Sequence, residues 1–382
     1  MHLELQSADV FMSSTLNDRL SQHWNCIQDT LFPWVEESLG PLSDKHRQLI
    51  TVLEFADIDS HFSTYRGITP GRPPIDRASI ACAFTAKAIY NLPTTRCLID
   101  RLKVDKTLRQ ICGFLHIHEI PSESVFSRAF AEFANTQLGE KIHDSLINSY
   151  HADRLVGHIS RDATAIAARE KPLKKDPPKK EKKKRGRPKK DEVRTAPEPT
   201  RIELQLKMEN VALMLADLPK HCDIGSKVNS KGHKISWSGY KLHIDIADGD
   251  IPISCVLTSA STHDSQVAIP LATMTSKKVQ SCYDLMDSAY DSRHIRMHSQ
   301  SLGHVPLIDF NHRSKNDHRA FAPHEAERYK QRSSAERVNS RLKDSFNALC
   351  VRVKGHSKVM LHLMFGVIAL TVDQMIRLTA VT

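Results

Sequence analysis

Three acidic residues, far apart in the sequence, have the side-chain type and the local setting to hold metal ions. Asp162 lies inside the strand-like segment SRDAT, Asp287 ends the segment YDLMD, and Glu336 lies in a segment with helical periodicity. Two-metal phosphoryl transfer requires carboxylates that converge on two Mg²⁺ ions about 4 Å apart. A few carboxylates suffice, because Mg²⁺ keeps several of its waters. Each acid alone also has an ordinary interpretation, as a strand-edge charge, a helix cap or a solvated helix residue.

The segment around Glu336 favours the metal-site interpretation. We expect one helix from about 324 to 346, and four residues with polar or charged side chains share one face of it: Tyr329, Arg332, Glu336 and Lys343. At about 100° per residue, all four fall within an arc of about 60°. Two cations beside one carboxylate suit a metal ligand flanked by groups that bind phosphate. The alternative is an i,i+4 ion pair between Arg332 and Glu336.

The elements that must position these residues follow an α/β pattern from Leu155 onward. LVGHISRDATAIA is typical of a strand, and GYKLHIDIA and IPISCVLTSAS are typical of a hairpin that turns at Asp248-Gly249. CYDLMD and HVPLIDF predict two more strands, with helical segments between them. This order predicts an α/β RNase H-like core with a mixed five-stranded sheet. Asp287 would lie at the carboxyl edge of that sheet, where α/β sites form.

Residues 1–150 show helical periodicity and predict an all-α N-terminal domain that precedes a catalytic domain at 151–382. Residues 66–109 contain nine basic and three acidic side chains, which could form a face that binds DNA phosphates. The basic residues considered for this face are Arg66, Arg72, Arg96, Arg101, Lys103 and Arg109. A solvated helix surface explains the same charges equally well.

An insertion at about 169–199 separates the first strand from the hairpin and contains a basic tract. Residues 171–190 hold twelve Lys/Arg and two acids, which equals the net charge of +10 of the whole chain. The core of this tract resembles an AT-hook, which binds a narrow A·T-rich minor groove. Its residues are Arg185, Gly186, Arg187 and Pro188. The alternative is a disordered Lys/Pro-rich segment that raises DNA affinity without reading sequence. After the insertion, we expect one amphipathic helix capped by Thr200.

The composition of the 382 residues excludes several other classes of protein. Hydrophobic residues make up 40%, which is ample for a core, and the eight cysteines include no CxxC pair. A disulfide scaffold and a structural zinc site are therefore not expected. The N-terminal sequence MHLELQSADV lacks the pattern of a signal peptide. The apolar stretch 359–372 is too short to span a bilayer and predicts a buried helix.

The residues around the three acids resemble those of the DDE transposases of bacterial insertion sequences. YKQRSSAERVNSRLK matches the Y-x2-R-x3-E-x6-K signature of that family, and DLMDSAYDS is similar to its D-A-G-Y-D motif, with Ser288 in place of the usual Ala. RDATAIA resembles the family's first-Asp strand, and residues 239–265 resemble its intervening hairpin. The segment from GRPPIDRAS to SRAFAEFA, residues 71–134, resembles the helical domain that commonly precedes this core, and the resemblance as a whole covers about residues 60–160 and 200–375.

The resemblance implies a function and assigns roles to residues. Asp162, Asp287 and Glu336 would be the catalytic, metal-binding acids, with Mg²⁺ as cofactor and Mn²⁺ as its substitute. Tyr329, Arg332 and Lys343 would contact the DNA backbone. The enzyme would nick the ends of its element and join the freed 3′-hydroxyl to target DNA. We expect a homodimer in the active complex, no membrane association and a location in the bacterial cytoplasm.

Some alternatives stay open from the sequence alone. The chain could be a non-catalytic or decayed DNA-binding protein, or a metal-dependent nuclease of the same fold that cuts without joining. Four neighbouring acids could be further ligands or supporting partners: Asp245, Asp264, Asp284 and Asp291. For His263 and Asp264, we favour the start of a helix over a catalytic role.

Overall fold

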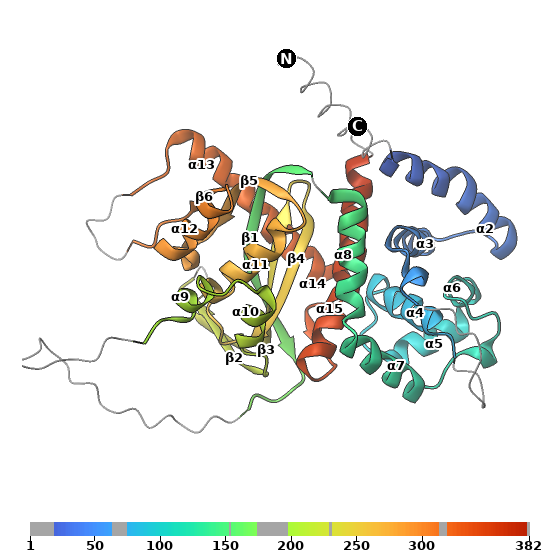
Figure 1. Cartoon of the computed structure of the whole chain (residues 1–382). Helices are drawn as coiled ribbons and strands as arrows, with labels where there is room; N and C mark the ends of the chain where they lie inside the picture. The colour runs from blue at the N-terminus through green and yellow to red at the C-terminus, as the bar shows by residue number, and fades with distance from the viewer. Residues whose placement is uncertain are drawn as a thin grey trace, which may run out of the picture.

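The computed structural model describes residues 19–62, 75–152, 154–173, 198–228, 231–312 and 319–379. Helices form the whole described part of the N-terminal half, as the periodicity predicts (Figure 1). They are η1 (Ile27–Leu31), α2 (Phe32–Leu39), α3 (Asp44–Ala56), η2 (Ile58–His61), α4 (Arg77–Ile89), α5 (Thr95–Val104), α6 (Lys106–Ile111), η3 (Ile117–Glu119), α7 (Glu123–Asn135) and α8 (Leu138–His151).

Local sequence signals explain how two of these helices form. Asp76 caps α4, because its carboxylate accepts hydrogen bonds from the backbone N–H groups of Ala78 and Ser79. In α7, Phe126, Phe130 and Phe133 share one buried face, as their spacing predicts. The Phe126 and Phe130 rings pack against Phe84 of α4, and the Phe133 ring packs against Phe62.

The described residues of the second half form a mixed sheet of seven strands. They are β1 (Leu155–Ala168), β2 (Asp223–Val228), β3 (Lys234–Ala247), β4 (Ile251–Ser259), β5 (Gln280–Met286), β6 (Val305–Ile308) and β7 (Cys350–Val351). The order is β2-β3-β1-β5-β6, with β4 paired to β3 and β7 paired to β1. β3 runs antiparallel to β1, whereas β5 runs parallel to β1 and β6 parallel to β5. The predicted fold class, a helical region followed by an RNase H-like α/β core, is confirmed.

Two features of the second half differ from the prediction. Among the described residues, the sheet has two strands beyond the expected five. The sequence does not predict them, because β7 has only two residues and β2 (DIGSKV) lacks regular alternation of apolar and polar residues. The helix expected after Thr200 is two helices, α9 (Arg201–Gln205) and α10 (Val211–Asp217). Asn210 caps α10 by accepting a hydrogen bond from the Ala212 N–H, so the chain starts a new helix there.

The helix that carries the signature residues is also interrupted. It consists of α13 (Pro323–Tyr329), a 3₁₀ turn η6 (Lys330–Arg332) and α14 (Ser333–Ser345). A 3₁₀ turn advances about 120° per residue, so the face calculated for one regular α-helix does not hold across it. The predicted arc of four aligned side chains is therefore wrong in detail.

Four further elements complete the core: α11 (Ala268–Ser276), α12 (Arg293–Ser301) and the short turns η4 (Asp264–Gln266) and η5 (Ser288–Tyr290). The last helix, α15 (His356–Thr379), packs against α3, α4, α7 and α8 on one side and against β4 on the other (Figure 1). By length and composition α15 could cross a membrane, but most of it is buried inside the protein, as predicted. One hydrophobic core thus runs from the N-terminal helices through α15 to the sheet.

Candidate active site

Asp162 lies in β1, and Asp287 lies level with it, directly after the end of the neighbouring parallel strand β5. The register pairs Arg161 of β1 with Met286 of β5. Asp162 directly follows Arg161, and Asp287 directly follows Met286. The Asp162 side chain is 19% exposed and accepts a 2.9 Å hydrogen bond from the Asn339 side chain. Asp287 accepts a 3.0 Å hydrogen bond from the backbone N–H of Ala289, which holds it at the start of η5.

The surroundings of this pair disfavour negative charge. Burial raises the pKa of Asp162 to about 6, and the charges of Asp287 and Asp264 add to the rise. Burial also raises the pKa of Asp287, again with a contribution from the charge of Asp264. Arg332 opposes the rise at both acids. Two partly buried carboxylates with excess negative charge are a donor set that a divalent cation would neutralise.

Arg332 lies between Asp162 and Glu336. One guanidinium nitrogen lies 3.8 Å from Asp162 Oδ1, and another donates a 2.7 Å hydrogen bond to Glu336 Oε1. The Glu336 side chain is 64% exposed. In the described part of the chain, no three His, Cys, Asp or Glu side chains lie close enough to hold one metal ion. The structure thus brings Asp162 and Asp287 together and leaves Glu336 on the other side of Arg332.

Tyr329 and Lys343, the other two predicted DNA contacts, flank this site. The Tyr329 hydroxyl donates a 3.2 Å hydrogen bond to the carbonyl of Met286, the residue before Asp287. Burial raises the pKa of Tyr329 to about 12, which keeps the hydroxyl protonated. Lys343 is half-buried in the last turn of α14, where burial and the charge of Lys227 lower its pKa. Lys343 has no hydrogen-bond or ion-pair partner among the described residues.

Three of the four neighbouring acids form ion pairs with basic side chains. Asp245 accepts two 2.8 Å hydrogen bonds from the buried guanidinium of Arg161. Asp284 pairs with His304, and Asp291 pairs with Arg296. Arg161 was not predicted as a functional residue, although its position next to Asp162 in SRDAT was a usable signal. Adjacent strand residues face opposite sides, so Arg161 supports the sheet from the face opposite to Asp162.

The expected basic face of the N-terminal half is only partly present. Arg109 is buried and donates to the carbonyl of Leu102, so its predicted contact with phosphates is wrong. Arg96 and Arg101 form ion pairs with Glu123 and Asp105. Two sets of basic residues lie outside the described residues: Arg66 and Arg72, and the AT-hook-like Arg185, Gly186, Arg187 and Pro188.

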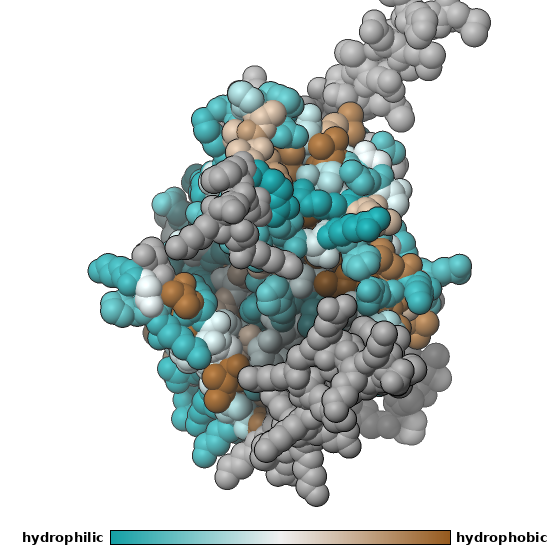
Figure 2. All heavy atoms as spheres, turned by 90° about the vertical axis from the view of Figure 1, so that its left-hand side faces the viewer, coloured by the Kyte–Doolittle hydropathy of each residue, from teal (hydrophilic) through white to brown (hydrophobic). Residues whose placement is uncertain are grey.

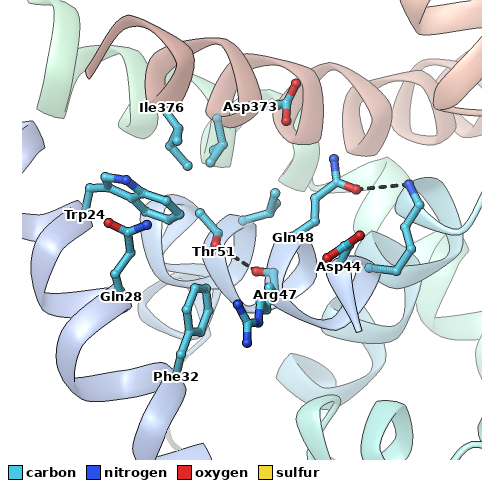
Figure 3. Close-up of a pocket in the computed structure, with 12 residues that line it drawn as sticks. Trp24, Gln28, Phe32, Asp44, Arg47, Gln48, Thr51, Asp373 and Ile376 are labelled. Atoms are coloured by element: carbon cyan, nitrogen blue, oxygen red, sulfur yellow. Dashed lines mark hydrogen bonds between the residues drawn. The ribbon is translucent and has the colours of Figure 1, made fainter. Parts of the chain in front are cut away.

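Two surface features bear on where a partner could bind. The side of the molecule that carries α12 and α13 is mostly hydrophilic where described residues are visible, with scattered apolar groups (Figure 2). A pocket of about 470 Å³ lies at the other end of the molecule, between the N-terminal helices and α15 (Figure 3). Trp24, Phe32, Thr51 and Ile376 line it, and none of the predicted catalytic acids does.

Comparison with known protein families identifies both halves of the chain. Residues 214–372 match the family described as Transposase DDE domain. The chain carries the catalytic domain of a DDE transposase. Residues 35–132 match the family described as Transposase domain (DUF772), so the helical half of this transposase is a transposase domain as well. The DDE match includes Asp287 and Glu336 but begins after Asp162. Neither the search of curated proteins nor that of solved structures gave a match.

Proposed function

We propose that this transposase nicks DNA at the ends of its own element and joins the freed 3′-hydroxyl to target DNA by Mg²⁺-dependent phosphoryl transfer. The observation that carries the proposal is the pair formed by Asp162 and Asp287. These acids lie level with each other, in β1 and directly after the end of β5, are partly buried, and have raised pKa values. Neighbouring acids whose pKa values are raised by burial and by nearby negative charge are typical of catalytic sites.

Asp162 and Asp287 would hold the divalent metal, with Mn²⁺ able to replace Mg²⁺ because both take oxygen ligands. When bound, the metal would supply Lewis-acid activation of the attacking oxygen and stabilisation of the leaving oxygen. Asn339 would keep the Asp162 carboxylate in place through its 2.9 Å hydrogen bond. Tyr329 would fix the end of β5, and with it Asp287, by donating to the Met286 carbonyl.

Glu336 would join Asp162 and Asp287 at the metal after its hydrogen bond with Arg332 is broken. Its exposed side chain is held by the hydrogen bond from Arg332, and the Arg332 guanidinium separates it from Asp162. Once released from Glu336, Arg332 would bind a phosphate oxygen of the DNA next to the reacting bond. Lys343, which has no partner among the described residues, would bind a phosphate further along α14. The observed ion pair between Arg332 and Glu336 would then belong to the free enzyme, and the proposed phosphate contact to the DNA-bound enzyme.

The remaining parts of the proposal concern partners. DNA, as transposon ends and as target, is the substrate, and the basic tract at 171–190 would add affinity for its backbone. We propose a homodimer in the active complex, so that two element ends are processed together, and a location in the bacterial cytoplasm.

A strand-joining assay tests the proposal. The purified chain is incubated with linear DNA that carries the sequences flanking its gene, a target plasmid and Mg²⁺. We expect nicks at the element ends followed by joined products. Nicks without joined products would instead identify a nuclease, and DNA binding without nicks would identify a non-catalytic DNA-binding protein.

A further inference from the structure

Asp264 lies close to the Asp162–Asp287 pair, although it is not part of the predicted set of three acids. It begins η4, and η4 packs against η5, the turn that Asp287 caps. Its charge acts on both Asp162 and Asp287. A third element of the fold thus brings a third carboxylate to the site.

One oxygen of Asp264 is held in place and the other is not. The ammonium group of Lys241 lies 2.8 Å from Asp264 Oδ1 and also donates a 2.9 Å hydrogen bond to the carbonyl of Thr262. Asp264 Oδ2 accepts no hydrogen bond from the residues that the structure describes. The carboxylate is therefore oriented by a lysine while it retains a free oxygen, which is the arrangement of a carboxylate ready to accept a further ligand.

Two buried side chains near Asp264 each have a polar atom without a hydrogen-bond partner in the described part of the chain. The Tyr290 side chain is 1% exposed, and its hydroxyl has no hydrogen-bond partner. The charges of Asp264, Asp162 and Asp287 all act on this phenol. His243 is fully buried, and its Nδ1 lies 3.9 Å from Asp264 Oδ1 without a hydrogen bond.

The His243 ring has one partner, because its Nε2 is hydrogen-bonded to Thr258 Oγ1, but the Tyr290 hydroxyl has none. A buried polar group without a partner costs about 1–3 kcal/mol, so the Tyr290 hydroxyl calls for an explanation. A bound, hydrated cation provides it for Tyr290. Its waters donate hydrogen bonds, and the Tyr290 hydroxyl can accept one from a water while it donates to a carboxylate that has turned toward the cation. Because Mg²⁺ reaches many carboxylates through its waters, the three acids need not lie within direct ligand distance of one another.

We propose that Asp264 is a further carboxylate of the metal site, which acts together with Asp162 and Asp287, and that the Tyr290 hydroxyl donates a hydrogen bond into this site. This inference rests on the proposed function, because it presupposes that Asp162 and Asp287 hold the metal. It assigns the η4 turn a role that the local sequence does not suggest, since His263 and Asp264 look only like the start of a helical turn.

Binding of Mn²⁺ to the full chain without DNA tests the proposal, measured by the loss of the electron paramagnetic resonance signal of free Mn²⁺. Asp264→Asn should raise the Kd at least about tenfold. Asp291→Asn is the matched control, because Asp291 also follows β5 but is paired with Arg296, and its Kd should stay within about twofold of wild type. An Asp264→Asn variant that binds Mn²⁺ like wild type would overturn the inference.

Asp162→Asn separates this inference from the proposed function. If Asp162→Asn weakens Mn²⁺ binding and Asp264→Asn does not, only the inference about Asp264 fails. If neither variant weakens binding, the metal site of the proposed function fails as well. Melting temperatures of all variants show whether each is folded.

Two more variants distinguish a metal-site role from a structural one. If Asp264 serves only to anchor its loop through Lys241, then Lys241→Gln should weaken Mn²⁺ binding as much as Asp264→Asn does, and this result would contradict the proposal. Under the proposal, Lys241→Gln keeps a Kd within about threefold, since the carboxylate remains. Tyr290→Phe should raise the Kd several-fold, and an unchanged Kd would remove Tyr290 from the site.

Discussion

Arg332 donates a 2.7 Å hydrogen bond to Glu336, and the same guanidinium lies 3.8 Å from Asp162. The positively charged side chain of Arg332 therefore lies between Asp162 and Glu336, two of the three acids assigned to the metal. The same contact fits two interpretations, a simple ion pair on a helix and the free state of a phosphate-binding arginine. The two interpretations differ in what removal of the arginine does.

Arg332→Ala should weaken binding to the transposon end by about 1.5–3 kcal/mol, as expected for a hydrogen bond to a charged phosphate. If Arg332 were only an ion-pair partner, the variant would change stability by about 0.3–0.5 kcal/mol and leave DNA affinity unchanged. Arg337→Ala is the matched control, because Arg337 lies on the same helix and pairs with Asp250. Affinity and melting temperature, measured for both variants, separate the two interpretations.

Lys343→Ala should weaken end binding in the same way without disturbing the contact between Arg332 and Glu336. The half-buried lysine has no partner in the described part of the chain, so its loss should cost the free protein little stability. A titration of end binding against salt concentration should show a slope reduced by about one phosphate contact. A slope equal to that of wild type would exclude Lys343 from the DNA interface.

Asp162→Asn should stabilise the metal-free protein above pH 6. Because burial raises the pKa of Asp162 to about 6, the folded state binds a proton more tightly than the unfolded state does. The stability of the wild type should therefore fall by about 1–2 kcal/mol, relative to the variant, as pH rises from about 4 to above 6. Urea unfolding from pH 4 to pH 8 measures the difference.

Asp291→Asn should have the opposite effect on stability. Burial alone would raise the pKa of Asp291, but hydrogen bonds from the Asn311 N–H and from Arg296 lower it. Its ionised form therefore stabilises the fold above its unfolded pKa, and the variant should be less stable at pH 7. If Asp162→Asn also destabilised the protein at pH 7, the account of a repulsive acid pair would be wrong.

Tyr329→Phe should reduce strand cleavage, because the Tyr329 hydroxyl holds the carbonyl of the residue before Asp287. Tyr150→Phe is a suitable control, since the Tyr150 hydroxyl forms a 2.8 Å hydrogen bond with His23 in the helical half. Each variant should lose about 1 kcal/mol of stability. Only Tyr329→Phe should cleave DNA more slowly. Equal cleavage rates in the two variants would show that Tyr329 has no role in positioning Asp287.

Deletion of residues 174–190 should lower overall DNA affinity and flatten its dependence on salt. This segment carries eleven Lys/Arg and two acids, and neutralised phosphates release counterions in proportion to the number of contacts. Catalytic competence at low salt should survive, because residues 174–190 include none of the acids assigned to the metal site. The slope of log affinity against log salt concentration is the measurement, and an unchanged slope would show that the tract does not bind phosphates.

The sequence predicted five strands of the mixed sheet and their order along the chain, because these strands carry clear patterns. The strand around Asp162, the hairpin that turns at Asp248-Gly249, and the strand that ends before Asp287 are all present. The two short strands were missed because β7 has two residues and β2 has no regular alternation. The pairing of these strands, not their composition, makes them part of the sheet.

The arrangement of the site was less accessible from the sequence. Helical periodicity places Arg332 and Glu336 on one face, but the 3₁₀ turn at Lys330–Arg332 changes the direction of the side chains before it. The proximity of Asp264 to Asp162 depends on the packing of η4 against η5, which are separated in the chain by α11 and β5. Contacts of this kind are set by the tertiary structure and leave no local pattern.

The central claim is that Asp162 and Asp287 form the catalytic metal site. Its most direct test is the rate of Mg²⁺-dependent strand cleavage by Asp162→Asn and Asp287→Asn, with Asp291→Asn as control. Each of the first two changes removes one carboxylate charge with little change in size, and loss of a metal ligand should cost several kcal/mol of transition-state stabilisation. We predict that both variants bind the transposon end but lose cleavage by about a thousandfold or more, while the control cleaves at a rate near that of wild type. Near-normal cleavage by either variant in Mg²⁺ would contradict the claim.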